Sequence, residues 1–395
     1  MPQPSVLYDT LLILLKQAPW GDRRHLSTLA WMVAGLLTSG WIALDEWAPF
    51  AQSTVRRFSR WLSNPRIQPL RLYAALLRGT LGEFPDGRLH LAFDTTMLWG
   101  GFCVVQASLA YRGRSVPVAW KVMRHKSASV AFGGYRWVLV CAARVLAGRE
   151  VVLLADRGFI HVELPRWVRR TPGWHCRIRC KRGIGLFGKD GKRLVLRLSA
   201  GEVRYYEGVF LGAARVPVSL AVGWEKGAKE PWVVVSDEPA GPGTLRDYAL
   251  RFSIEEGFLD HKSGGFQWES SRLRDAKALQ RLCLVMATAT LVLVCQGVAV
   301  VADGKRRQVD PHWFRGLSHA RIGWNWIRHA VACGEAFDVI GIGDEARGDT
   351  GFLGPQPQQR LQQIDGRLRG LAMAPTRCLI GAIGRRVVLG RSDGI

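Results

Sequence analysis

The pattern of apolar and polar residues changes its period along the chain, and each change marks a different kind of structure. Up to about residue 80, apolar residues recur every three or four positions over 11–15, 26–37 and 42–50. This spacing puts them on one side of a helix. Thr38-Ser39-Gly40 interrupts the pattern. We therefore predict a helical N-terminal region, residues 1–82.

One helix of this region carries several arginines. Ser53-Thr54 can cap it, and its apolar residues follow at helical spacing. A helix, a short break and an Arg-rich helix are compatible with a helix-turn-helix that binds DNA, although many helical bundles show the same pattern. The residues concerned are Val55, Phe58 and Leu62 on the apolar side, with Arg56, Arg57 and Arg60.

From about residue 88 the period becomes that of strands, interrupted by two helical stretches. The predicted order is three strands in a meander, a helix, a strand, a helix and a strand. This is the order of the ribonuclease-H-like α/β fold, in which acidic residues gather at strand ends. The ranges are strands 89–94, 101–111, 115–123, 150–156 and 174–181, and helices 135–147 and 162–170.

Residues 182–236 are rich in β-branched and alternating residues, with turn residues at 188–191. We expect a β-strand insertion with its own sheet, formed by 194–198, 202–210, 217–224 and 231–236. A helical pattern returns at 245–262 and continues to about 302. Residues 83–302 would then be one ribonuclease-H-like domain that contains this insertion. The C-terminal region, 303–395, would be partly helical over 311–333 and poorly ordered over 342–375.

Leu282–Ala302 is apolar over a length that could cross a membrane. Its polar residues and the charged helix before it favour a buried core helix instead. No signal-peptide pattern is visible at the N-terminus. None of the eight cysteines forms a Cys-x-x-Cys pair, and His175, Cys176 and Cys180 would be split between strand faces. Reduced thiols in a cytoplasmic protein are therefore expected, rather than a zinc site.

The charge balance narrows the choice of partner. Hydrophobic content of 48% and charged content of 22% are typical of a globular protein, but 55 Lys and Arg face 32 Asp and Glu, a formal net charge of +23. Such a field attracts DNA, RNA or an anionic membrane surface, and its size favours nucleic acid over a merely solvated basic surface.

Three acidic residues stand out on this basic chain. Asp94 and Asp156 each follow an apolar run, so we expect both at strand ends. Glu255 follows Tyr248 and Arg251 at offsets that return to one helix face, and Lys262 lies seven residues further on. The helix alone could be a salt-bridged surface helix. Together, three carboxylates could hold two Mg²⁺ ions for phosphodiester cleavage, with the basic residues and the phenol on the phosphates.

The same residues resemble a known family. Phe93-Asp94-Thr95-Thr96, Ala155-Asp156-Arg157-Gly158-Phe159 and Tyr248-x2-Arg251-x3-Glu255-x6-Lys262 are similar to the signature of DDE insertion-sequence transposases of the YREK type, the insertion-sequence-4 group. Phe252 stands where that group usually has Trp. The resemblance covers roughly residues 85–300, and no signature position is missing.

The resemblance implies a fold, an activity and partners. It makes Asp94, Asp156 and Glu255 the catalytic metal ligands for Mg²⁺, with Mn²⁺ able to substitute, and it makes Tyr248, Arg251 and Lys262 DNA-binding residues. It implies cut-and-paste transposition by a homodimer on paired element ends, in a bacterial cytoplasm at the nucleoid. Some members cut through a hairpin and stack a flipped base on a Trp, for which Trp232 is the candidate, although it could equally be a sheet-core aromatic.

Three alternatives stay open from the residues themselves. Arg157 and Lys181 could contact phosphates or simply face solvent. The protein could be another ribonuclease-H-like nuclease, such as a resolvase or an RNA-directed enzyme. It could also be a non-catalytic DNA-binding protein derived from a transposase.

Overall fold

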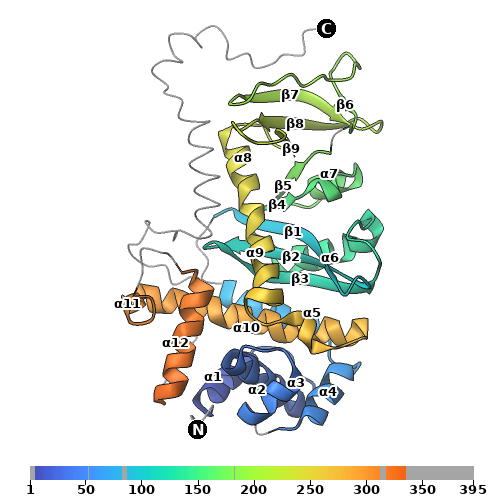
Figure 1. Cartoon of the computed structure of the whole chain (residues 1–395). Helices are drawn as coiled ribbons and strands as arrows, with labels where there is room; N and C mark the ends of the chain where they lie inside the picture. The colour runs from blue at the N-terminus through green and yellow to red at the C-terminus, as the bar shows by residue number, and fades with distance from the viewer. Residues whose placement is uncertain (1–4, 52, 82–86, 182, 312–316, 335–395) are drawn as a thin grey trace.

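The computed structural model describes residues 5–51, 53–81, 87–181, 183–311 and 317–334. Its centre is a mixed nine-stranded sheet in the order β3-β2-β1-β4-β5-β9-β8-β7-β6. Helices α1–α4 of the N-terminal region lie beyond the β3 end of this sheet, and α10 lies between them and the sheet, with the fifth N-terminal helix, α5, beside it (Figure 1).

The first five strands follow the predicted order. β1 (Leu89–Leu98), β2 (Phe102–Tyr111) and β3 (Arg114–Arg124) form an antiparallel meander, whose second turn contains Gly113 at positive φ. β4 (Val151–Ala155) then pairs parallel with β1, and β5 (Trp174–Arg179) pairs parallel with β4. The intervening helices are α6 (Phe132–Val145) and α7 (Glu163–Arg169). β4 is buried along its whole length, as its unbroken apolar run predicts.

The β-rich segment pairs differently from the prediction. It does not form a sheet of its own, because β9 (Trp232–Ser236) pairs antiparallel with β5 and so extends the main sheet. β8 (Val216–Gly223), β7 (Val203–Leu211) and β6 (Leu186–Phe187) continue outwards from β9.

The predicted strand 194–198 is wrong. Leu194 donates a backbone hydrogen bond to Leu186, but beyond it the segment has no ladder. Leu194, Leu196 and Leu198 do pack on the core while Val195 is 70% exposed. The alternation of the sequence is therefore real, and only the partner strand is missing.

The N-terminal region is helical, as predicted. Its elements are α1 (Ser5–Leu15), α2 (Arg23–Ser39), α3 (Leu44–Trp47) with a 3₁₀ turn (Ala48–Phe50), α4 (Val55–Ser63) and α5 (Pro69–Leu81). Gly40 ends α2 in the left-handed conformation, and Thr54 caps α4 by accepting from the Arg57 amide. Arg56 and Arg60 are exposed on α4, whereas Arg57 turns inwards to donate to Thr28.

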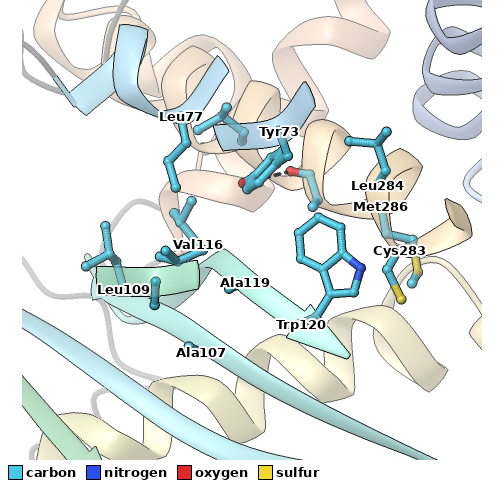
Figure 2. Packing of buried hydrophobic residues seen from close by; sticks show 14 of the residues in the cluster. Tyr73, Leu77, Ala107, Leu109, Val116, Ala119, Trp120, Cys283, Leu284 and Met286 are labelled. Atoms are coloured by element: carbon cyan, nitrogen blue, oxygen red, sulfur yellow. Dashed lines mark hydrogen bonds between the residues drawn. The ribbon is translucent and has the colours of Figure 1, made fainter. Parts of the chain in front are cut away.

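Helix α10 (Ala276–Ala302) is a long apolar helix in the hydrophobic core. It is long and apolar enough to cross a membrane by length and composition, but 89% of the apolar window is buried inside the protein. Trp120 of β3 packs against Cys283 and Leu284 of this helix and edge-on to Tyr73 of α5, with ring centroids 5.3 Å apart (Figure 2). The favoured prediction of a buried core helix agrees with this packing.

The predicted helix 245–262 is helical but not uniform. α8 (Pro242–Ala249) passes through a 3₁₀ turn (Leu250–Phe252) into α9 (Ser253–Leu259), which ends in a π-helical turn (Asp260–Gly264). A 3₁₀ turn (Trp268–Ser271) precedes α10, so the helical pattern does not run unbroken to residue 302. α11 (Arg306–Val309) and α12 (His319–Cys333) follow α10. α12 lies within the range 311–333 that was predicted to be helical. Residues 342–375, predicted to be poorly ordered, lie outside the described residues.

Two glycines let α10 and α12 cross in backbone contact. A Cβ added to Gly297 would overlap the carbonyl of His319, and one added to Gly323 would overlap the carbonyl of Leu293. Because both obstacles are backbone atoms, neither can turn aside as a side chain would.

We predict that Gly297→Ala or Gly323→Ala lowers the free energy of unfolding by about 1–3 kcal/mol or more through overpacking. Urea unfolding followed by circular dichroism measures the effect. Gly133→Ala is the matched control, because it adds the same methyl in α6, where no atom lies within 4 Å. Equal stability of all three variants would contradict the close crossing.

The π-helical turn buries a histidine. His261 is 4% exposed, its Nε2 lies 3.2 Å from Thr290 Oγ1 of α10, and its ring stacks on Phe266. Burial lowers the pKa of His261 from 6.5 to about 4.

We predict that His261 makes the protein less stable as the pH falls from about 6.5 to about 4. In this window the unfolded chain takes up a proton that the folded state refuses, so stability decreases with decreasing pH, by up to about 3 kcal/mol. Urea unfolding of the native protein and of His261→Gln across this range tests it. The variant should show a shallower slope, and identical slopes would overturn the assignment.

Candidate functional site

The register of the central strands brings two acidic residues side by side. Phe93 of β1 pairs with Ala155 of β4 in a parallel ladder, so Asp94 and Asp156 are the next residues on adjacent strands. Parallel neighbours lie about 5 Å apart across a sheet. Asp156 follows the end of β4, as predicted. Asp94 does not end its strand, because β1 continues to Leu98 along β2; it marks only the end of the pairing with β4.

The helical segment supplies the third carboxylate and a buried cation. Arg251, 3% exposed, donates from Nη1 to Asp94 Oδ2 at 3.0 Å and from Nη2 to Glu255 Oε1 at 2.7 Å. Its guanidinium also lies 4.6 Å from the Phe252 ring centroid. One arginine thus joins a carboxylate of β1 to a carboxylate of α9.

Asp156 is held by a different group. The hydroxyl of Tyr248, which is fully buried, donates to Asp156 Oδ1 at 3.3 Å. Burial raises the pKa of Tyr248 well above its usual range, so the phenol stays protonated and remains a donor. Tyr248 and Arg251 therefore contact Asp156 and Asp94, and Glu255 is joined to Asp94 only through Arg251, despite the 3₁₀ turn in this segment.

The pKa values of Asp94 and Arg251 both depart from their ordinary values. Burial raises the pKa of Asp94 to about 6, against the opposing effect of Arg251 and with a further contribution from Asp156 and Glu255. Burial alone would lower the pKa of Arg251, but Tyr248 and the acidic residues raise it above its ordinary value. Arg251 therefore stays charged, and its buried Nε has no hydrogen-bond partner among the residues that the structure describes.

The donor set suits a divalent cation of the Mg²⁺ type, because all three groups offer carboxylate oxygens. Asp94 and Asp156 are fixed by strands, and the side chain of Glu255 is 47% exposed and can change rotamer. With Arg251 paired to Asp94 and Glu255, the ligand oxygens of the triad do not all lie within 4.8 Å of one another. The chemistry of these residues therefore fits such an ion. In the structure, the guanidinium of Arg251 supplies the positive charge that the ion would supply.

The other predicted residues lie around this centre without joining it. Lys262 donates to the carbonyl of Met97, three residues beyond Asp94 on β1. Trp232 meets Tyr248 edge-on at 5.2 Å and stacks on Phe252 at 5.8 Å. Arg157 is exposed and pairs with Glu230 at 3.2 Å, and Lys181 is exposed.

A second charged cluster lies at the opposite ends of the strands. Glu150, His175 and Glu238 place ligand atoms within 4.8 Å of one another, a grouping that we did not predict. Glu150 precedes β4 while Asp156 follows it, so the clusters are about 20 Å apart. Arg88 bonds to both glutamates and Arg177 bonds to Glu238, so this is an ion-pair network in the structure.

The structure separates His175 from Cys176, as the alternation of strand faces predicts. His175 faces Asp237 and Glu238, whereas Cys176 is buried in the core. Burial raises the pKa of the Cys180 thiol to about 12. The seven cysteines described in the structure are free thiols.

The fold and the site define a mixed α/β protein that gathers carboxylates around one buried arginine. No protein-family model matches the chain, and no curated protein matches it. Among solved structures, the chain is similar to the cryo-EM structure of a piggyBac transposase synaptic complex with hairpin DNA. The TM-score is 0.41 at 9% identity, and the alignment covers 98% of this chain and 85% of that one.

We predict that Arg251→Met costs about 3–5 kcal/mol of stability without metal, because two carboxylates lose their shared cation. Millimolar Mg²⁺ should restore more stability to the variant than to the native protein, since the ion supplies the missing charge. Thermal unfolding with Mg²⁺ or EDTA measures both. Arg60→Met, on the exposed side of α4, should change stability by less than about 0.5 kcal/mol. A variant as stable as the native protein in EDTA would contradict the role given to Arg251.

Proposed function

We propose that the protein is a metal-dependent DNA transposase of the DDE type, which cleaves DNA at element ends and joins it to a target. The observation that carries the proposal is the pairing of Arg251 with Asp94 and Glu255, beside Asp156 on the adjacent strand. The YREK signature, which this sequence resembles, contains the same residues. Asp94 lies 157 positions from Arg251 and Glu255 lies 4 positions from it, while Asp156 follows the strand next to that of Asp94.

Each residue has a task in this reaction. Asp94, Asp156 and Glu255 would hold two Mg²⁺ ions, or Mn²⁺ in their place. When bound, such a pair supplies Lewis-acid activation of water and stabilises the leaving oxygen. Tyr248 orients Asp156 by its hydrogen bond. Arg251, released from its carboxylates once their charge is neutralised, would donate to a backbone phosphate.

The strand order supports the finer fold assignment. β3, β2 and β1 are antiparallel, and β4 and β5 follow β1 in parallel, with helices α6 and α7 between them. We propose that these elements are a ribonuclease-H-like core within a domain over 83–302, and that β6–β9 are its insertion. The helical region 1–82 would be the DNA-binding domain, and 303–395 the C-terminal region.

The charge of the chain supports DNA as the partner. With +23 net charge, binding of terminal repeats and target DNA is electrostatically favourable, and exposed Arg56 and Arg60 on α4 offer phosphate contacts. We further propose a homodimer that pairs two element ends, in the bacterial cytoplasm at the nucleoid. Sedimentation of the protein with and without element-end DNA tests the stoichiometry.

Trp232 lies where it could serve a hairpin step. Its ring stacks on Phe252 and meets Tyr248, so it is half-buried against the helix that carries the site. A base flipped out of the duplex would need such an aromatic surface. Denaturing gels of the cleavage products separate hairpins from nicked strands and so test this part of the proposal on its own.

We predict that Asp94→Asn, Asp156→Asn and Glu255→Gln each abolish Mg²⁺-dependent strand cleavage while DNA binding persists, because each removes a metal-binding charge and keeps the shape. Cleavage and gel-shift assays measure the two properties. Glu207→Gln, an exposed residue of β7, is the control and should cleave normally.

The choice of substrate separates the rival functions. Cleavage of branched DNA or RNA in preference to element ends would indicate a different nuclease. Binding without nicking by the native protein would indicate a non-catalytic DNA-binding protein. Retained cleavage by any purified variant of the triad would overturn the metal-site assignment.

A further inference from the structure

A cationic pocket opens beside the candidate site, at the same end of the sheet. Ala155 of β4 pairs with Ile178 of β5, so Asp156 and Arg179 are neighbours just as Asp94 and Asp156 are. The row across the strand ends thus runs from Asp94 through Asp156 to Arg179. Arg179 lines a pocket of about 220 Å³ between the end of β5 and the β6–β9 segment.

The lining of the pocket has two parts. Its cations come from three separate segments of the chain and are Arg157, Arg179, Lys181 and Arg193. Ile184, Leu194 and Leu196 form an apolar wall beside them. A wall of this kind next to clustered cations matches a ligand with an anionic group on an apolar body, such as a phosphate on a sugar.

One carboxylate already occupies the cationic side. Glu230 Oε1 accepts from Arg157 at 3.2 Å and from Arg179 at 2.8 Å. A carboxylate that receives two arginines, one from β5 and one from the 3₁₀ turn after β4, takes the position that a phosphate oxygen would take. Glu230 precedes β9 in a loop and is only partly buried, so its side chain can leave this position without disturbing the sheet.

The size of the pocket limits what it can hold. Pockets that enclose a whole small-molecule ligand measure about 300–1,000 Å³. At about 220 Å³ this pocket has room for a phosphate with part of its sugar, and a base would lie outside.

We infer that this pocket binds a backbone phosphate of a single DNA strand that continues past the candidate site, and that Glu230 is an internal competitor that the phosphate displaces. The inference rests on the proposed function, because the strand is the one held at Asp94 and Asp156. From the sequence alone, Arg157 and Lys181 could either contact phosphates or face solvent. In this pocket they act together with Arg179 and Arg193.

Glu230→Gln tests the inference, because it keeps the shape of the side chain and removes the competing charge. Binding of a short fluorescent single-stranded oligonucleotide to the full-length protein is followed by anisotropy over a range of salt. The variant should bind roughly tenfold more tightly, about 1.4 kcal/mol. Its affinity should also fall more steeply with salt, by about 0.7 in the logarithmic slope for one additional phosphate.

Glu207→Gln is the matched control, since it makes the same charge change on β7 outside the pocket. If both variants gain equally, the effect is that of net charge and the inference is overturned. Arg193→Gln should weaken binding and flatten the salt slope, and it is exposed enough to leave folding intact, which circular dichroism verifies. Unchanged binding by Arg193→Gln would also count against the pocket.

Two further arms identify the phosphate and separate this inference from the proposed function. Equal competition by oligonucleotides with and without a 5′-phosphate indicates an internal phosphodiester and supports the inference, whereas competition by the phosphorylated one alone indicates a strand end and would overturn it. Cleavage by the native protein with no selective effect of Glu230→Gln would overturn the pocket and leave the transposase proposal intact. A selective effect of Glu230→Gln without any cleavage would do the reverse.

Discussion

The candidate site depends on one buried guanidinium. Arg251 is the cation that allows carboxylates from β1 and α9 to lie together, beside the carboxyl ends of the central strands of a mostly apolar sheet. Burying like charges is costly unless an opposite charge is close. Burial raises the pKa of Asp94 even with Arg251 bonded to it, because the guanidinium does not fully offset the cost of removing the carboxylate from water. Acidic and basic side chains are thus interleaved in the same few residues.

Sequence reasoning predicted best where the signal is local. The Thr54 cap, the buried run of β4 and the helical spacing of Tyr248, Arg251 and Glu255 each involve residues within a few positions of one another, and each has the predicted geometry. The proximity of Asp94 and Asp156 followed instead from the expected strand order, because neighbouring parallel strands bring their carboxyl ends together.

What could not be predicted depends on pairing between distant segments. The alternation of Leu194, Leu196 and Leu198 is the same whether or not a partner strand exists, so it could not show that the ladder is missing. The antiparallel pairing of β5 with β9 joins residues more than 50 positions apart, and periodicity carries no information about it. The same pairing brings Glu230 to Arg179, and for that reason the pocket was invisible in the sequence.

The continuity of the sheet has a consequence for how two copies of the chain can meet. One edge strand, β3, packs against α6, α9 and α10, and the other, β6, has two residues. β6 pairs only with Phe210 and Leu211, so the outer edge of β7 over residues 203–209 has no partner strand within the described part of the chain. A bulge between Tyr206 and Val209 and the exposed charges of Arg204 and Glu207 lie along this edge, and both features disfavour pairing with a foreign strand. Edge-to-edge association of two copies is therefore opposed by helices at β3 and by irregular, charged backbone at β7.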